Sequence, residues 1–137
     1  MLRRLGRLLT AVLALLAVLV PLVAGRVVDG YTAFQWTCYH AAQPIGAVQA
    51  RKTARWAART IDRVAPLPLA ADAARLALQT ARALEPRNRE ASIAAYVQVR
   101  SALEAVQATR GRGLGLGGLV AEAAALENAA RPAGAEN

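Results

Sequence analysis

The most reactive side chains in this chain of 137 residues are a single cysteine, Cys38, and a single histidine, His40. Nucleophilic catalysis needs a base that faces the nucleophile, and side chains two positions apart on a helix point in different directions. One cysteine forms neither an internal disulfide nor a thiolate metal site, and metal ligands come in sets. We therefore interpret Cys38 as a free thiol, with pairing to a second chain as the alternative in an oxidising compartment. We expect neither a metal nor a cofactor.

The acidic residues are scattered singly along the sequence. General acid–base catalysis relies on carboxyl groups that meet at one site, and these acids do not pair convincingly on a helical face. They are Asp29, Asp62, Asp72, Glu85, Glu90, Glu104, Glu122, Glu127 and Glu136. Gly113, Gly115 and Gly118 have the G-x-G-x-x-G spacing, but the dinucleotide-binding motif follows a strand, and here the sequence predicts a preceding helix. We predict that the protein is not an enzyme.

Basic residues form the clearest pattern that could bind a partner. Four arginines recur at every fourth position, with a lysine and a tryptophan beside the row: Arg51, Lys52, Arg55, Trp56, Arg59 and Arg63. On a helix this spacing places the arginines along one face. The pattern is typical of a surface that contacts anionic headgroups or a partner, with Trp56 as an interfacial wedge. The alternative is a solvated face whose charge Asp62 partly offsets.

An apolar stretch at residues 8–24 determines where we expect the chain to reside. It contains no charged residue and is preceded by Arg3, Arg4 and Arg7. A helix rises about 1.5 Å per residue and the hydrocarbon core is about 30 Å thick, so a helix that continues to Val28 is long enough to span a bilayer. The alternative is a signal peptide that is cleaved near Gly25 and leaves an exported soluble protein.

The distribution of arginines orients this stretch. Only Arg26 lies close after it, so the positive-inside rule places the N-terminus in the cytoplasm and the rest of the chain across the membrane. In a bacterium this location is the inner membrane, with most of the chain in the periplasm. The net charge of +8 then favours membrane lipids or an acidic protein partner, and we expect no nucleic acid partner.

Residues 26–43 are predicted to be an interfacial linker. Asp29-Gly30 is a turn signal at which the apolar helix would break, and a helix resumes over residues 31–42, up to the boundary that Pro44 indicates. The linker contains four aromatic residues, which favour the headgroup level of a membrane: Tyr31, Phe34, Trp36 and Tyr39. We interpret His40 as a polar residue at the same level.

Four further helices are predicted, over residues 44–64, 69–84, 89–109 and 119–130. Pro44 suits a first turn, Asn88 is a good N-cap and Gly111 a C-terminal stop. The first three helices have seams of small and apolar residues with alternating three- and four-residue spacing. The seams are Ala47, Ala50, Ala54, Ala57, Ile61 and Val64; Leu69, Ala73, Leu76, Thr80 and Ala83; and Ser92, Tyr96, Val99, Leu103 and Val106.

The sequence therefore predicts an all-α protein. A single N-terminal transmembrane helix is followed by a small extracytoplasmic helical hairpin or three-helix bundle. The predicted divisions are an anchor or signal peptide (1–25), the interfacial linker (26–43), a helical domain (44–110), a glycine-rich linker (111–118), and a short helix with a disordered tail (119–137).

The segment from Ala83 to Ala91, Ala-Leu-Glu-Pro-Arg-Asn-Arg-Glu-Ala, resembles the junction between two tetratricopeptide repeats. The resemblance implies one helix–turn–helix at this place. No second copy occurs at that family's period of about 34 residues, so we assign the chain to no family.

Alanine-rich helices bury little apolar area, so a domain built from them gains stability by packing on a partner. We therefore expect a non-enzymatic, single-pass membrane protein that acts as an accessory or scaffold subunit of a larger membrane complex, or that self-associates through its alanine-rich helices. The alternatives are the exported soluble binding protein and a peripheral module that binds anionic lipid through its arginine row.

Overall fold

Five helices make up most of the computed structural model, which describes residues 1–65, 67–111 and 115–132. The helices are α1 (Leu2–Ala41), α2 (Ala47–Val64), α3 (Pro68–Leu84), α4 (Arg89–Arg110) and α5 (Gly117–Ala130). No strand occurs among the described residues, and the all-α prediction is confirmed. The prediction of a disordered tail concerns mainly residues 133–137, which lie outside the described residues, as do residues 112–114 of the predicted glycine-rich linker, whose last two residues belong to α5.

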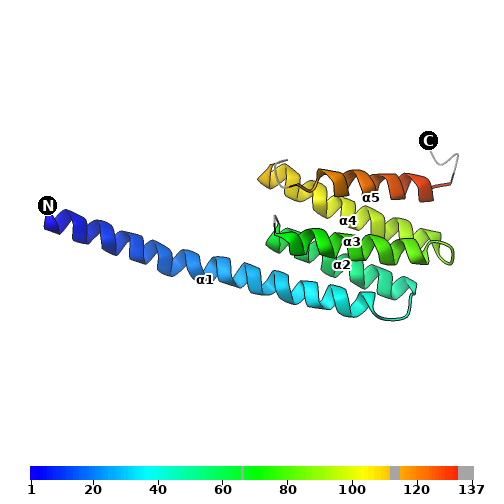
Figure 1. Ribbon diagram of the computed structural model, residues 1–137, viewed down its shortest axis with the longest axis horizontal. Coiled ribbons are helices and arrows are strands. Elements are labelled where there is room, and N and C mark those ends of the chain that lie inside the picture. The colour runs from blue at the N-terminus through cyan, green and yellow to red at the C-terminus, as the bar shows by residue number, and fades with distance from the viewer. Residues whose placement is uncertain (66, 112–114, 133–137) are drawn as a thin grey trace.

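The first helix has two segments with different surroundings. Its residues 2–28, which we call the free segment, are all exposed and extend over most of their length beyond the other helices, with Arg26 near the C-terminal end of α2. Its residues 29–41, the packed segment, lie beside α2 (Figure 1). Every residue of the free segment is exposed, and burial begins at Asp29 and Gly30. Pro21 lies inside the helix without ending it.

The predicted helix break at Asp29-Gly30 is wrong, because α1 continues without interruption to Ala41. Gly30 serves a close helix contact instead of a turn. A Cβ atom at this position would overlap Cγ1 of Val64 on α2, so the missing side chain lets the two helices approach. Of the predicted linker, residues 26–41 are helical, and residues 42–46 alone connect α1 to α2.

The second helix runs back along the packed segment of α1 (Figure 1). It begins at Ala47 after Gly46, so the prediction that Pro44 lies in its first turn is wrong. Its predicted seam is confirmed, since one face is buried and Ala47 at its start is partly buried. The buried seam residues are Ala50, Ala54, Ala57, Ile61 and Val64.

The third helix has the predicted extent within one residue but buries a different face. Of the predicted seam, only Ala73 is buried, whereas Leu69, Leu76 and Thr80 are partly exposed and Ala83 is exposed. The buried residues are Ala70, Ala73, Ala74, Ala77, Leu78, Ala81 and Leu84. Because α3 contacts α1, α2, α4 and α5, its buried side consists mostly of alanine, together with Leu78 and Leu84, and Leu69 and Leu76 are only partly buried.

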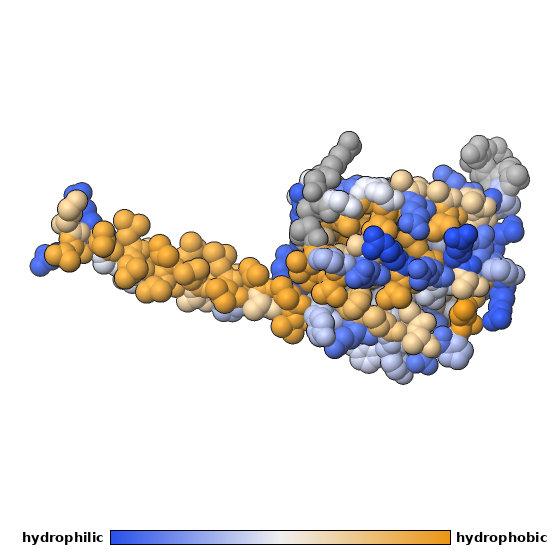
Figure 2. Space-filling view, in the orientation of Figure 1, coloured by the Kyte–Doolittle hydropathy of each residue, from blue (hydrophilic) through white to orange (hydrophobic). Residues whose placement is uncertain are grey.

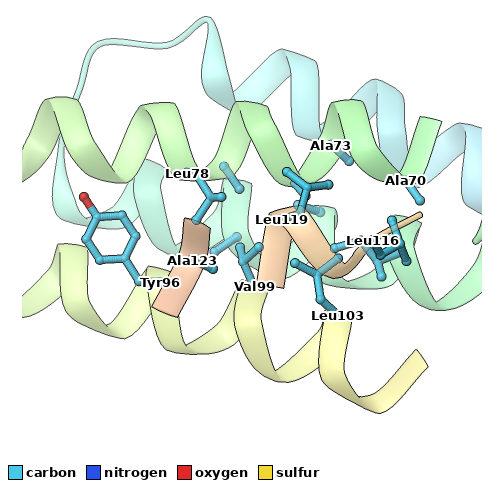
Figure 3. Close-up of a cluster of buried hydrophobic side chains, with 14 of the residues drawn as sticks. Ala70, Ala73, Leu78, Tyr96, Val99, Leu103, Leu116, Leu119 and Ala123 are labelled. Carbon is cyan, nitrogen blue, oxygen red and sulfur yellow. The ribbon is translucent and has the colours of Figure 1, made fainter. Parts of the chain in front are cut away.

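The fourth and fifth helices complete the core. The seam of α4 is buried as predicted, and Tyr96, Val99 and Leu103 lie close to Leu78 of α3 and Leu119 of α5 (Figure 3). The side chain of Asn88 accepts a hydrogen bond from the amide of Ala91 at 3.0 Å, which confirms the predicted N-cap.

The ends of α4 and α5 also match most of the predictions. Gly111 follows α4 with a φ of 94°, in the region that glycine favours, and the helix–turn–helix at Leu84–Arg89 is present. α5 begins at Gly117, two residues earlier than predicted.

Candidate functional site

The arginine row lies on the outer face of α2. Arg51, Lys52, Arg55 and Arg59 are exposed, and Trp56 and Arg63 are partly exposed. The opposite face of the helix is the buried alanine seam, so the packing of α2 turns all six predicted contact residues toward one side of the molecule. Their role as a lipid or partner contact stays a prediction.

Asp29 of α1 neutralises one end of this row. Arg59 donates hydrogen bonds to both carboxylate oxygens of Asp29, at 2.9 and 3.3 Å. Nε of Arg63 lies 2.9 Å from Oδ2 of Asp29, but its N–H is not aimed at an acceptor. The hydrogen bond from Arg59, together with both positive charges, lowers the pKa of Asp29 below its ordinary value. Asp29 therefore stays ionised and compensates part of the arginine charge.

The other end of the row keeps its charge. Arg51, Lys52 and Arg55 form no ion pair with any acidic residue in the described parts of the chain. They lie near the end of α2 that is remote from the free segment of α1 (Figure 1). Three uncompensated positive charges within about one helical turn favour an anionic binding partner.

Aromatic rings from two helices lie beside these charges. Trp36 of α1 stacks on Trp56 of α2, with ring centroids 5.9 Å apart, and Tyr39 meets the edge of Trp36 at 5.6 Å. The guanidinium of Arg59 lies 5.9 Å from the ring centre of Trp56. Trp36 and Tyr39 are 44% and 55% exposed, so this cluster keeps a large surface open to a partner.

We call the surface formed by Trp36, Tyr39, Arg51, Lys52, Arg55 and Trp56 the basic–aromatic face. The sequence pattern predicts Trp36 and Tyr39 at the headgroup level and does not group them with Trp56. The missed signal is the spacing of small residues in the packed segment: Gly30, Ala33 and Thr37 recur at three- and four-residue intervals and are all buried. A helix with its small residues against α2 must turn its aromatic residues outward and toward Trp56.

His40 and Cys38 lie in helix contacts. His40 is 9% exposed and its Nδ1 is 3.2 Å from Oε1 of Gln49 on α2. Cys38 is free, and burial, followed by the negative charge of Asp72, raises the pKa of its thiol. The thiolate that would act as a nucleophile or metal ligand is therefore disfavoured.

Other chemistry is sparse in the described part of the chain. No group of three or more histidine, cysteine, aspartate or glutamate residues lies close enough to hold a metal ion there. Gly113 of the G-x-G-x-x-G pattern lies outside the described residues. The arrangement can bind anionic and apolar surfaces by charge and by aromatic contact.

The free segment of α1 is the second feature with functional meaning. Among the described residues, α1 is the one helix whose length and apolar composition would allow it to cross a membrane, and its apolar stretch has no buried residue. The space-filling view shows this segment as an apolar rod with a hydrophilic tip (Figure 2).

Comparison with protein-family models, with curated proteins and with solved structures finds no match to this chain.

Proposed function

We propose that the chain is a single-pass membrane protein in which α1 crosses the bilayer and continues as the first helix of a helical bundle. The observation that carries this proposal is the unbroken α1 helix, which is apolar and exposed in one segment and packed in the other. An apolar surface on every side of a helix is costly in water and favourable in lipid. The bundle is then joined to the membrane without a flexible linker.

The regular structure of α1 favours a membrane anchor that is retained in the mature protein over a signal peptide that is cleaved near Gly25. Proteases cut preferentially in exposed, irregular segments, whereas Gly25 lies in the middle of a regular helix. Three arginines precede the apolar stretch, which favours a cytoplasmic N-terminus and a periplasmic bundle in a bacterial inner membrane.

Within this topology, the protein acts as a non-catalytic accessory or scaffold subunit of a membrane complex. The alanine seams of α2 and α3 pack inside the chain's own bundle, so the partner is recognised by another surface. The basic–aromatic face fits that role, because tryptophan, tyrosine and arginine are the residues that contribute most at protein interfaces. Its three uncompensated charges select an acidic partner protein.

The geometry disfavours the alternative in which the arginine row lies flat on lipid. Arg63 is near the free segment of α1, and Arg51, twelve residues earlier on α2, is about 18 Å farther from it along the helix. When α1 crosses the membrane, the row runs away from the bilayer surface, and its nearest members are paired with Asp29.

The anchor is tested by expressing the full chain in bacteria, washing the membranes with alkaline carbonate and measuring the intact mass. We expect an uncleaved chain that carbonate does not extract. A mature chain that begins near Arg26 and is found in the soluble fraction would overturn the anchor and favour the exported binding protein.

The partner face is tested by native mass spectrometry of the protein extracted in mild detergent. We expect a stoichiometric partner with net negative charge. The double variant Arg51→Glu and Arg55→Glu should weaken this complex at least tenfold, since like charges across an interface cost several kcal/mol. The matched control, Arg87→Glu and Arg89→Glu, changes two exposed arginines on another part of the domain and should leave it intact. Equal binding by both variants would contradict the assignment of the face.

A further inference from the structure

A hollow of about 250 Å³ lies where the free segment of α1 meets the end of α2. Its basic lining consists of Arg26, Arg63 and Arg110, and its apolar lining consists of Val23, Val27, Val64, Ala65 and Leu67. The hollow therefore combines positive charge with apolar side chains, and two of the latter, Val23 and Val27, belong to the proposed membrane span.

Two of the three arginines in the hollow have no acidic partner. Arg63 lies against Asp29, but neither Arg26 nor Arg110 forms an ion pair in the described parts of the chain. Arg26 donates to the carbonyl of Asp62 at 3.3 Å, and Arg110 donates to the carbonyls of Ala65 and Asp62 at 2.6 and 3.1 Å.

These contacts hold the two guanidinium groups in place but leave some of their N–H donors unused. Asp62 and Ala65 lie at the C-terminal end of α2, where carbonyl groups lack helical partners and attract positive charge. A guanidinium has five N–H donors, so Arg26 and Arg110 retain donors for an additional acceptor. Two preorganised cations with unused donors are suited to a phosphate group.

The position of the hollow favours a lipid headgroup as the source of such a phosphate. Arg26 comes directly after the apolar stretch, so in a membrane-spanning α1 it lies at the level of the lipid headgroups. In that position Val23, about one turn before Arg26, and Val27, directly after it, would lie beside the first carbons of a neighbouring acyl chain. A free phosphate would use only the arginines, whereas a phospholipid would use both parts of the lining.

We propose that Arg26 and Arg110 form a binding site for the phosphate of one anionic phospholipid, held at the junction between the membrane span and the bundle. This inference rests on the proposed anchor. The bound lipid connects three helices, α1, α2 and α4, and holds the bundle against the membrane surface. Because the two uncompensated cations exceed the charge of one phosphodiester, an anionic lipid is preferred to a zwitterionic one.

The test counts lipids that remain on the full-length chain in detergent, by native mass spectrometry, during titration with phosphatidylglycerol or phosphatidylcholine. We expect one retained phosphatidylglycerol per chain and weaker retention of phosphatidylcholine. The double variant Arg26→Gln and Arg110→Gln should weaken retention about 30-fold, since each basic residue near an anionic surface contributes about a fivefold change. Arg51→Gln with Arg55→Gln removes the same charge far from the hollow and should retain the lipid.

Three outcomes would overturn this site. Equal retention by the two double variants would mean that Arg26 and Arg110 only cap α2. Equal retention of the two lipids would remove the charge preference, and displacement by millimolar inorganic phosphate would make the site one for free phosphate.

Circular dichroism melting of both variants shows whether a lost lipid reflects lost folding, and Arg110→Lys, which keeps the charge, should restore part of the retention. Carbonate extraction of the chain would overturn the anchor as well, whereas a membrane-bound chain without retained phosphatidylglycerol would overturn the lipid site alone.

Discussion

The two segments of α1 share one regular helix and differ in everything that surrounds it. The free segment has leucine and valine around its whole circumference, and all its residues are exposed. The packed segment has small residues on one side, with Gly30, Ala33 and Thr37 buried against neighbouring helices. A helix that is apolar on all sides suits lipid, and one that is small on one side suits close contact with protein. The comparison shows that side-chain size and distribution, rather than helical structure, assign each segment its environment.

The absence of a joint between these segments has a mechanical consequence. A flexible linker would let the bundle move freely relative to its anchor. In this chain, Asp29 and Gly30 are part of the helix and are also in contact with α2. In the proposed topology, the height and rotation of the basic–aromatic face are therefore fixed by the position of α1 in the membrane.

A leucine-to-alanine substitution should affect the free energy of unfolding very differently in the core and in the free segment, and we expect this difference to be the largest of those proposed here. Leu103 of α4 is fully buried, whereas Leu13 is 58% exposed. Leu103→Ala should lower the free energy of unfolding by about 2–5 kcal/mol, because it removes buried surface and leaves a cavity. Leu13→Ala should change it by less than about 0.5 kcal/mol. Urea unfolding in detergent, followed by the fluorescence of Trp36 and Trp56, measures both, and equal losses would contradict the division of roles.

Glycine substitutions within α1 test the boundary between its segments. Gly30→Leu should lower the free energy of unfolding by about 1–3 kcal/mol, since the new side chain would overlap Val64 and separate α1 from α2. Gly25→Leu places the same side chain five residues earlier, where a Cβ atom meets nothing within 4 Å. The control should leave unfolding of the bundle unchanged in the same urea experiment. A tolerated Gly30→Leu would show that the packed segment is not held closely on α2.

Much of the fold follows from local sequence signals. Asn88 and Gly111 mark the ends of α4 through their own hydrogen-bonding and backbone preferences. The seams of α2 and α4 could be predicted because each of these helices carries a distinct stripe of apolar residues. For α3 the stripe is ambiguous, since alanine occurs on several sides and the buried side is decided by the neighbouring helices.

The candidate site was predictable only in part, for a related reason. The row of arginines on α2 is a local pattern. The pairing of Asp29 with Arg59 joins residues 30 positions apart, and the stacking of Trp36 on Trp56 depends on how α1 lies on α2. The turn signal at Asp29-Gly30 concealed that contact, because the same two residues can end a helix or serve a close approach of two helices.

Lowering the pH should destabilise the bundle but not affect the free segment, because the free segment contains no acidic residue. Glu127 of α5 is 6% exposed, and Arg100 and Arg131 donate to it at 2.6 and 2.7 Å. Burial raises the pKa of its carboxyl, but the hydrogen bonds and charges of the two arginines outweigh burial and lower it below the ordinary value of 4.5. The folded state therefore binds this proton less tightly than the unfolded state does.

The stability that Glu127 contributes is consequently complete above about pH 4.5 and is lost as the pH falls through the lower folded pKa. Glu127→Gln should cost about 1.5 kcal/mol at pH 7, the low end for a hydrogen bond to a charged group, and should flatten the acid limb of the stability curve. Urea unfolding between pH 7 and pH 3 measures this. In the proposed topology, retention of α1 in the membrane should not change over that range. An unaltered acid limb in the variant would assign the acid sensitivity to other groups.

Asp29 marks the point where the free segment ends, and its replacement should have the smallest effect. Asp29→Asn leaves Arg59 and Arg63 without their shared carboxylate, but all three side chains are about one-third to one-half exposed, where water and salt weaken ion pairs. We expect a loss of unfolding free energy that is smaller than for Glu127→Gln and that disappears in high salt. The control Asp72→Asn breaks the exposed pair with Arg75 and should cost less, because that pair has one arginine.

In an NMR titration, the Asp29 carboxyl should show a pKa below 3.8, because Arg59 stabilises its ionised form. A pKa of Asp29 at or above that value would mean that its pair with Arg59 does not form in solution. A loss of unfolding free energy as large as that of Gly30→Leu would mean that charge, rather than close packing, fixes the two segments of α1 to their different surroundings.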